Sequence, residues 1–548
     1  MDTPPIQRRG ANPDLFSMTS ELVRWRLRWM RPALVLLTMA TLASMFAAVR
    51  ADARVADRPA EVIVQLRPGT SLAEGRALVG SLGGRVTREL EIINGFGAVV
   101  TPDAAAALER DSRVHAVSAN AAVQSTADSI SDPGLLKTSF NQSVKATKAW
   151  DNGSTGRGVG VAVVDTGIAG NLPDFRVSGS DSRSRVIASV VTNPNARSAG
   201  DAYGHGTHVA GLIAGNGNNR SSYDPFDSDY VGTAPQANLI SIKVADANGD
   251  ASLIDVIDGI QFAVDHKDDY NIRVLNLSLN SSVAESYKTD PLDAAAEEAW
   301  FSGIVVVTAA GNSGTAADAV SYAPANDPYV ITVGAVDDQG TDSIGDDQLA
   351  PWSSRGRTQD GVQKPEIVAP GSQLVSTMSP GSTYTAMCPT CMVGTSYMRL
   401  GGTSMSAAVV SGIVADILHE RPSLTPNQVK GALMATARDV PGAGSEPQTD
   451  VAAKTSATAA NAGLTPSTLI NPSTGKIDMS RADWQRASFR SADSLLTAPW
   501  SPSASWRCAI CATVDGSADV DSSASWRASW RASWRASWRA SWRTSFTK

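Results

Sequence analysis

The chain has 548 residues, of which 42 % are apolar and 18 % are charged. These proportions are typical of a globular protein with several domains, and they exclude a disordered chain, a collagen-like chain and a protein with many membrane spans. The formal net charge of −7 gives no overall attraction to nucleic acid or to anionic lipid, and no nucleic-acid partner is expected.

The amino-terminal segment is typical of an export signal. Four arginines between Arg24 and Arg31 precede an uncharged stretch over residues 33–49, and Ala51 and Ala53 follow as small residues suited to signal peptidase. We therefore expect residues 1–53 to direct secretion. A second interpretation stays open, because this stretch is near the short limit for a bilayer span and would also serve as an uncleaved membrane anchor.

Residues 54–127 are predicted to form a small α+β domain. Strands are expected at 62–66, 90–93, 97–100 and 114–117, and helices at 72–82 and 102–110. The order β-α-β-β-α-β is that of a ferredoxin-like split βαβ fold. A small domain between an export signal and a larger domain is either a folding aid and plug for its neighbour or an ordinary accessory domain.

Residues 128–442 have the hydrophobic pattern of an α/β domain. Continuous β-branched runs, which mark strands buried on both faces, occur at 159–164, 239–244, 272–279, 304–308 and 330–336. Helical patterns lie between several of these runs, and two helix starts are well marked, at Ser252 and at Thr425-Pro426. This alternation predicts a parallel sheet with helices on both faces.

Residues 443–548 are rich in Ala, Ser and Thr, and we expect them to lack a packed core. They end in a tandem repeat, Ala-Ser-Trp-Arg, from Ala524 to Arg543. In an extended chain, this repeat would place Ala and Trp on one face and Ser and Arg on the other. It is either a solvated low-complexity tail or a segment that contacts a cell surface or a partner.

Three short motifs stand at the ends of predicted elements of the α/β domain. Asp165 ends the first buried strand, where open α/β sheets place their sites. His205 begins a helix between two glycines, and Ser404 follows a Gly-Gly pair at a helix start, whose N–H groups favour a developing anion. Each residue alone has a structural explanation, such as a helix cap. Together, Asp, His and Ser in this order match one of the known orders of a nucleophilic triad.

On these three motifs, residues 149–440 resemble the subtilisin family of serine endopeptidases. The resemblance implies a subtilisin-like fold and polypeptide substrates. It also implies that Ser404 attacks the scissile carbonyl, that His205 takes the serine proton and that Asp165 holds the imidazole. The segment Ala-Ala-Gly-Asn-Ser-Gly matches the family's oxyanion segment, so Asn312 would hold the oxyanion together with the backbone N–H of the nucleophile.

The resemblance extends to the substrate cleft and to the small domain. Ser278, Leu279 and Asn280 match the family strand that binds extended substrate, and Gly311 belongs to the same cleft. The family usually has glycine where Asn280 stands, which leaves the side-chain preference at that subsite open. The small domain resembles the family's inhibitory propeptide, so we expect a self-processing precursor whose residues 124–127 pass through the active-site cleft.

The roles of one aspartate as a metal ligand and of two cysteine pairs are open to more than one interpretation. No cofactor is required for the reaction, but Asp174 stands where the family often has a calcium ligand, so a structural calcium ion is a candidate. Cys388 with Cys391, and Cys508 with Cys511, form two C-x₂-C pairs. In an exported protein we expect local disulfides, whereas a zinc site that joins both pairs and a redox role are the alternatives.

The sequence therefore predicts a secreted serine endopeptidase that is made as an inactive precursor. A catalytically silent protein of the same fold, which binds a surface through its Trp/Arg tail, is the main alternative. The filled catalytic positions disfavour it. A nucleotide-dependent oxidoreductase is suggested by glycines 156, 158 and 160, but these precede the strand, whereas a phosphate-binding loop must follow it.

Overall fold

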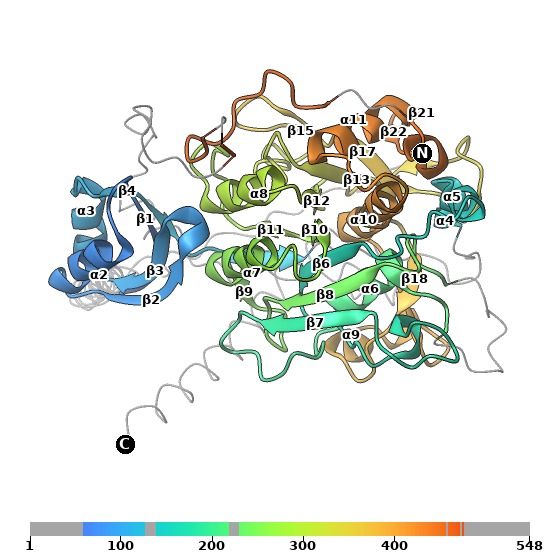
Figure 1. Ribbon diagram of the computed structural model, residues 1–548, viewed down its shortest axis with the longest axis horizontal. Coiled ribbons are helices and arrows are strands. Elements are labelled where there is room, and N and C mark those ends of the chain that lie inside the picture. The colour runs from blue at the N-terminus through green and yellow to red at the C-terminus, as the bar shows by residue number, and fades with distance from the viewer. Residues whose placement is uncertain (1–58, 126–138, 219–229, 456–458, 472–473, 476–548) are drawn as a thin grey trace, which may run out of the picture. The chain divides into compact units, whose positions relative to one another are not determined.

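The structure is a computed structural model, and it describes residues 59–125, 139–218, 230–455, 459–471 and 474–475 (Figure 1). The predicted export signal, Cys508, Cys511 and the Ala-Ser-Trp-Arg repeats lie outside these residues. Among the described helices, none combines the length and the apolar character that a membrane crossing requires.

The small domain has the predicted order of elements. They are β1 (Ala60–Leu66), α2 (Leu72–Ser81), β2 (Arg85–Leu90), η2 (Glu91–Ile93), β3 (Gly95–Val100), α3 (Pro102–Arg110) and β4 (Val114–Ala119). The antiparallel sheet has the order β2-β3-β1-β4, which is the ferredoxin-like arrangement. The strand predicted at 90–93 is wrong, because Glu91–Ile93 forms a 3-10 turn. The true strand, β2, precedes it and carries mostly polar, half-exposed residues.

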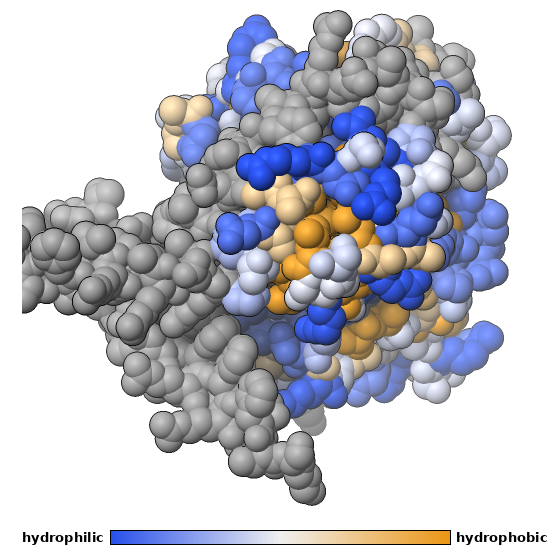
Figure 2. Space-filling model, turned by 90° about the vertical axis from the view of Figure 1, so that its left-hand side faces the viewer, coloured by the Kyte–Doolittle hydropathy of each residue, from blue (hydrophilic) through white to orange (hydrophobic). Residues whose placement is uncertain are grey.

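The two faces of this sheet have different partners. One face packs against α2 and α3 and forms a core of its own, which includes Val64, Leu78, Phe96 and Leu108. The opposite face carries Ile63 of β1, which belongs to the core of the large domain. Figure 2 shows the side of the molecule that carries this domain, with apolar residues in the centre and hydrophilic residues around them.

The large domain is built on an eight-stranded sheet. Its strands are β6 (Gly160–Asp165), β7 (Val186–Val191), β8 (Asn238–Lys243), β10 (Ile272–Leu277), β12 (Val305–Ala309), β13 (Ile331–Asp337), β14 (Gln348–Leu349) and β17 (Ile367–Pro370). The order is β14-β13-β12-β10-β6-β8-β7, with β17 also paired to β13, and β14 alone is antiparallel. The predicted parallel sheet is confirmed. The edge strand β7 is missing from the prediction because its side chains alternate between half-buried and exposed.

Helices cover both faces of the sheet (Figure 1). On one face, α6 (His205–Ala214) and α10 (Thr403–Glu420) pack against each other, and on the other α7 (Leu253–Asp265) packs against α8 (Pro291–Phe301). The marked helix starts are confirmed, since Ser252 caps α7 and Thr425 caps α11 (Pro426–Thr436). Further short elements are α4 (Phe140–Ser143), α5 (Ala146–Asp151), η3 (Pro173–Phe175), β15 (Gly356–Arg357), β16 (Gln363–Lys364), β18 (Leu374–Thr377), α9 (Thr383–Met387), η4 (Pro389–Cys391), β19 (Met392–Val393), β20 (Tyr397–Leu400) and β21 (Arg438–Val440).

Packing continues beyond residue 442, where the sequence predicts an unpacked tail. β22 (Gly444–Glu446) pairs with β21, and α12 (Thr449–Ala452) buries Ala452. Ile470 is fully buried as well. The backbone N–H of Ser467 donates to both carboxylate oxygens of Glu297, at 2.9 and 2.8 Å. A few buried residues and backbone contacts attach this segment to the large domain. Its Ala/Ser-rich composition does not indicate these contacts.

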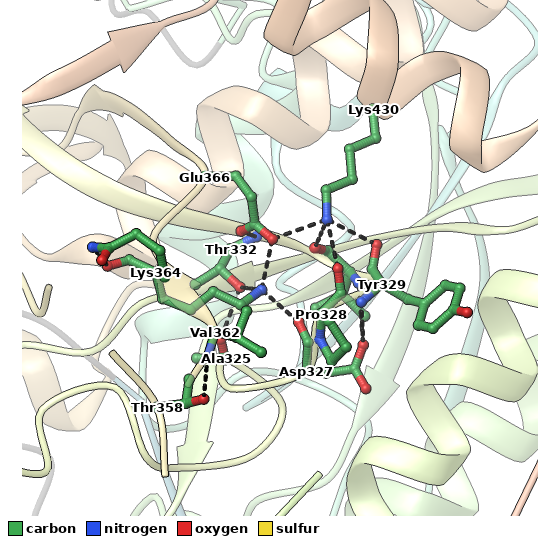
Figure 3. A network of polar contacts seen from close by, with 12 residues as sticks. Ala325, Asp327, Pro328, Tyr329, Thr332, Thr358, Val362, Lys364, Glu366 and Lys430 are labelled. Atoms are coloured by element: carbon green, nitrogen blue, oxygen red, sulfur yellow. Dashed lines mark hydrogen bonds and ion pairs between the residues drawn. The ribbon is translucent and has the colours of Figure 1, made fainter. Parts of the chain in front are cut away.

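A buried polar network joins α11 to the strands at one side of the sheet (Figure 3). Lys364 donates to Thr332 at 2.9 Å and to Glu366 at 2.7 Å, and Lys430 of α11 donates to the same Glu366 oxygen at 2.9 Å. Lys430 also donates to the backbone carbonyls of residues 328–330. Burial lowers the pKa of Lys430 to about 8. The two lysines outweigh the burial of Glu366 and hold its carboxyl pKa below its usual value.

A group of buried acids lies beside this network. Asp290, Asp293 and Glu297 belong to the start and middle of α8, and all three are buried with Asp327. Neither oxygen of Asp293 has a hydrogen-bond partner among the described residues. Burial, with the nearby Asp290 and Asp327, therefore raises the carboxyl pKa of Asp293 well above its ordinary value of 3.8.

We expect Asp293→Asn to stabilise the protein above neutral pH. The folded-state pKa of Asp293 is raised, so its stabilising contribution is complete below pH 3.8 and is lost as pH rises through the folded-state pKa. The amide of the asparagine variant does not ionise, so the variant does not lose this stability as pH rises. In a Ser404→Ala background, circular dichroism melting should show a midpoint raised by at least about 2–4 °C at pH 8 and little changed at pH 4. The exposed Asp151→Asn is the control, and equal shifts at both pH values would contradict the prediction.

Candidate active site

Asp165 and His205 meet at the junction of β6 and α6. Asp165 is the last residue of β6 and is 2 % exposed, and His205 is the first residue of α6 and is fully buried. The Nδ1 atom of His205 lies 2.8 and 2.9 Å from the two carboxylate oxygens of Asp165. Because a carboxylate accepts, Nδ1 carries the proton and Nε2 is the basic nitrogen.

This contact requires glycine after the histidine. A Cβ atom on Gly206 would lie 2.3 Å from the carbonyl oxygen of Gly167 and 3.1 Å from the Cβ of Asp165. Backbone at such a distance cannot move aside without separating the helix from the strand. The absence of a side chain at residue 206 is therefore what lets α6 begin so close to the end of β6.

Asp201 is a positioning residue that the sequence analysis missed. Its carboxylate accepts hydrogen bonds from the Thr166 hydroxyl at 2.8 Å, from the Gly204 N–H at 2.7 Å and from the Thr207 N–H at 2.8 Å. It therefore satisfies N–H groups at the start of α6 and joins them to the residue after Asp165. The available signal was an aspartate just before a helix start, which is a capping pattern.

Ser404 lies in the first turn of α10 and is fully buried. Its hydroxyl donates to the carbonyl of Ser278 at 3.0 Å, and the Ser278 hydroxyl donates to the carbonyl of Ser404 at 3.0 Å. The structure thus joins two of the residues that the sequence assigns to one cleft. Since α10 packs against α6, the helices that carry Ser404 and His205 are neighbours.

Asn312 is fixed against the start of α10. Its Oδ1 atom accepts hydrogen bonds from the backbone N–H of Thr403 at 3.1 Å and from the Thr403 hydroxyl at 3.0 Å. The Thr403 hydroxyl in turn accepts from the N–H of Gly311 at 3.0 Å. Because Oδ1 faces Thr403, the Nδ2 hydrogens point away from it. The turn itself needs glycine, since Gly311 has φ +98°.

The last strand of the small domain lies along the predicted substrate strand. β5 (Ala122–Ser125) pairs antiparallel with β11 (Leu279–Ser281), with Gln124 opposite Asn280. On its other edge β5 pairs with β9 (Ala251–Ser252). The small domain thus supplies the central strand of a three-stranded sheet whose outer strands belong to the large domain. Residues 126 and 127 lie outside the described chain.

Comparisons with known proteins agree with this geometry. The sequence profile of the subtilase family matches residues 156–461. The chain belongs to the subtilase family. It is 37 % identical to serine protease AprX of Bacillus subtilis over 349 residues, which cover 62 % of this chain and 73 % of that protein. It is 33 % identical to a thermostable alkaline protease of Halalkalibacterium halodurans over 408 residues, which cover 74 % of this chain and 94 % of the relative. By family, this subtilase is a serine protease.

A solved structure supports the subtilisin-like fold. Fervidolysin from Fervidobacterium pennivorans, described as a keratinolytic enzyme related to subtilisin, matches with a TM-score of 0.56 and 25 % sequence identity. The match covers 73 % of this chain and 62 % of fervidolysin, so this subtilase spans less than two thirds of that protein.

Asp174, the calcium candidate of this subtilase, contacts two hydroxyl groups of the protein. It is fully buried, and its carboxylate accepts from the Thr377 hydroxyl at 2.6 Å and from the Tyr397 hydroxyl at 3.2 Å. The described residues contain no group of three or more Asp, Glu, His or Cys side chains able to hold a metal ion. Asp174 therefore joins segments that are distant in sequence, and a structural calcium ion in this subtilase stays an untested candidate.

The first C-x₂-C pair is a disulfide. Cys388 and Cys391 are bonded to each other between α9 and β19. The expected local disulfide is confirmed for this pair. Because the bond uses both thiols, neither is a zinc ligand in this structure.

We expect Asp201→Ala to weaken both the fold and the activity of this subtilase. Three hydrogen bonds to a buried carboxylate are lost, with a cost of about 2 kcal/mol or more. The midpoint of thermal unfolding should fall by several degrees, and kcat should fall as His205 loses its support. Asp201→Asn, which keeps one acceptor oxygen, should be intermediate. The exposed Asp342→Ala is the matched control, and an Asp201→Ala variant that behaves like it would contradict the assignment.

Proposed function

We propose that this subtilase cleaves peptide bonds with Ser404 as nucleophile, His205 as general base and Asp165 as the residue that orients the imidazole. The observation that carries the proposal is the hydrogen bond between the His205 Nδ1 and Asp165. It fixes the tautomer whose Nε2 can take a proton, and it stabilises the imidazolium that forms. The buried start of α10 supplies the hydroxyl.

The reaction follows the chemistry of acyl transfer. Ser404 Oγ attacks the scissile carbonyl carbon while its proton moves to His205 Nε2. Negative charge develops on the carbonyl oxygen, where the Asn312 Nδ2 and backbone N–H groups at the start of α10 would donate hydrogen bonds. His205 then gives its proton to the leaving amine. In the second half of the reaction, water attacks the acyl-enzyme while His205 takes its proton, and His205 returns that proton to the departing Ser404 Oγ. Because Thr403 already binds the Oδ1 atom of Asn312, the Asn312 side chain needs little reorganisation to donate to the oxyanion.

The same proposal includes an inhibitory propeptide. β5 uses the edge of β11 that an extended substrate would use, and this supports a precursor whose cleft is occupied. The small domain is also bound by Arg88, whose guanidinium lies 3.3 Å from Asp255 and 3.1 Å from Asp258 of α7. We propose that self-cleavage follows export, so that the enzyme matures outside the cell. Contact of the Trp/Arg tail with a cell surface stays one of the two interpretations given above.

We expect Ser404→Ala to give an unprocessed precursor. Without the hydroxyl no acyl-enzyme forms, and turnover should fall by about 10⁴–10⁶. Mass spectrometry and amino-terminal sequencing of the secreted protein would show whether residues before the large domain remain attached. The exposed Ser423→Ala should mature normally. If purified Ser404→Ala matured without another protease, self-cleavage would be refuted. Failure of the unaltered protein to react with a fluorophosphonate would favour the catalytically silent alternative.

We expect Asn312→Ala to lower kcat by about 10²–10³ with a small change in KM, because a donor to the oxyanion acts mainly in the transition state. Steady-state hydrolysis of a peptide anilide would measure both constants. The exposed Asn171→Ala is the matched control. A change in KM alone would place Asn312 in substrate binding rather than in oxyanion stabilisation.

A further inference from the structure

Asn280, two residues after Ser278, is a buried polar side chain. The residue lies in β11 and is 7 % exposed. Its Nδ2 atom donates to the carbonyl oxygen of Ala309 at 3.1 Å. Because a carbonyl only accepts, this bond fixes which end of the amide is nitrogen. The Oδ1 atom is buried and has no hydrogen-bond partner among the described residues.

The amide of Asn280 lies against the turn that follows β12. A Cβ atom on Gly311 would be 3.3 Å from the Asn280 Oδ1 and 3.1 Å from the hydroxyl oxygen of Ser354. The side chain therefore reaches from β11 to the turn at residues 309–311. Its Oδ1 atom places a hydrogen-bond acceptor beside Gly311.

These two segments stand on either side of the Ser404 region. On one side, the carbonyl of Ser278, the residue before β11, accepts a hydrogen bond from the Ser404 hydroxyl. On the other side, the N–H of Gly311 donates to the Thr403 hydroxyl. A peptide paired with β11 and with its reactive carbonyl at Ser404 would send the side chain of that residue between the two segments. That side chain would meet the Asn280 amide.

We propose that Asn280 determines which side chain is accepted at the residue that supplies the scissile carbonyl. The proposal rests on the peptidase function proposed above. Glutamine, asparagine, threonine and serine donate a hydrogen bond to Oδ1, whereas an apolar side chain covers this buried acceptor and leaves it unpaired. The amide also takes up space that a large aromatic side chain needs. The enzyme therefore favours small or medium polar residues at this position over leucine and phenylalanine.

The test uses peptide anilides that differ only in the residue before the anilide: glutamine, threonine, leucine or phenylalanine. The full-length protein is purified after its own processing, and its reactive sites are titrated with a fluorophosphonate. We expect kcat/KM to be about 10–100-fold higher for glutamine than for phenylalanine. Asn280→Gly should remove this preference. Asn280→Leu, which keeps the volume without the acceptor, should still reject phenylalanine but lose the preference for glutamine over leucine.

The exposed Asn171→Gly should keep the unaltered profile. The inference is overturned if the unaltered enzyme prefers phenylalanine or leucine, or if titrated Asn280→Gly and Asn280→Leu keep its profile within about threefold. The first result needs no variant, so a folding defect cannot obscure it. If the unaltered protein hydrolyses none of the peptides and does not react with the fluorophosphonate, the proposed function itself fails. Ser404-dependent hydrolysis with the wrong profile rejects only the role of Asn280.

Discussion

The close approach of α6 to the carboxyl end of β6 is the constraint on which the site depends. It brings an imidazole and a carboxylate together where both are buried, and an uncompensated buried charge would be strongly unfavourable. The charge of the Asp165 carboxylate is compensated by two contacts, one with His205 and one with the backbone N–H of Thr166 at 2.7 Å. Lys243, at the end of the adjacent β8, donates to the carbonyl of Thr166 at 2.6 Å and to that of Gly200 at 2.8 Å. The strand ends around the histidine are thus held by backbone and side-chain contacts together.

The second constraint is the edge of β11 with which β5 pairs. An edge strand presents unpaired N–H and C=O groups, which favour pairing with any extended chain. In this structure β5 pairs with that edge, and its residue Val123 is buried in the core of the large domain. A substrate would need the same groups. The pairing of β5 with β11 and the pairing that we propose for substrate are therefore alternatives of one type, and the contacts of Arg88 with α7 favour the pairing with β5.

The sequence predicts those parts of the fold that are set by local physics. Buried parallel strands such as β6 and β12 are continuous apolar runs, and the capped helices α7 and α11 carry their start signals in adjacent residues. Strands with polar or alternating surfaces, β2 and β7, lack such a run and were misplaced or missed. The contact of Asp165 with His205 was expected from motif order, whereas Asp201 acts through three residues whose proximity exists only after folding.

Side-chain direction is the part of the site that the sequence could not supply. Asn280 was recognised as a departure from the family, but only the folded chain shows that its amide turns toward Ala309. The same holds for the network around Glu366, which joins Lys364 to Lys430 and braces β13, the neighbour of β12 in the sheet. β12 ends at Ala309, where the turn with Gly311 and Asn312 begins. Buried charges distant in sequence thus support the strand that leads to Asn312, the oxyanion donor of our proposal. The nearby Asn280 adds the contact that we propose for distinguishing one substrate side chain from another.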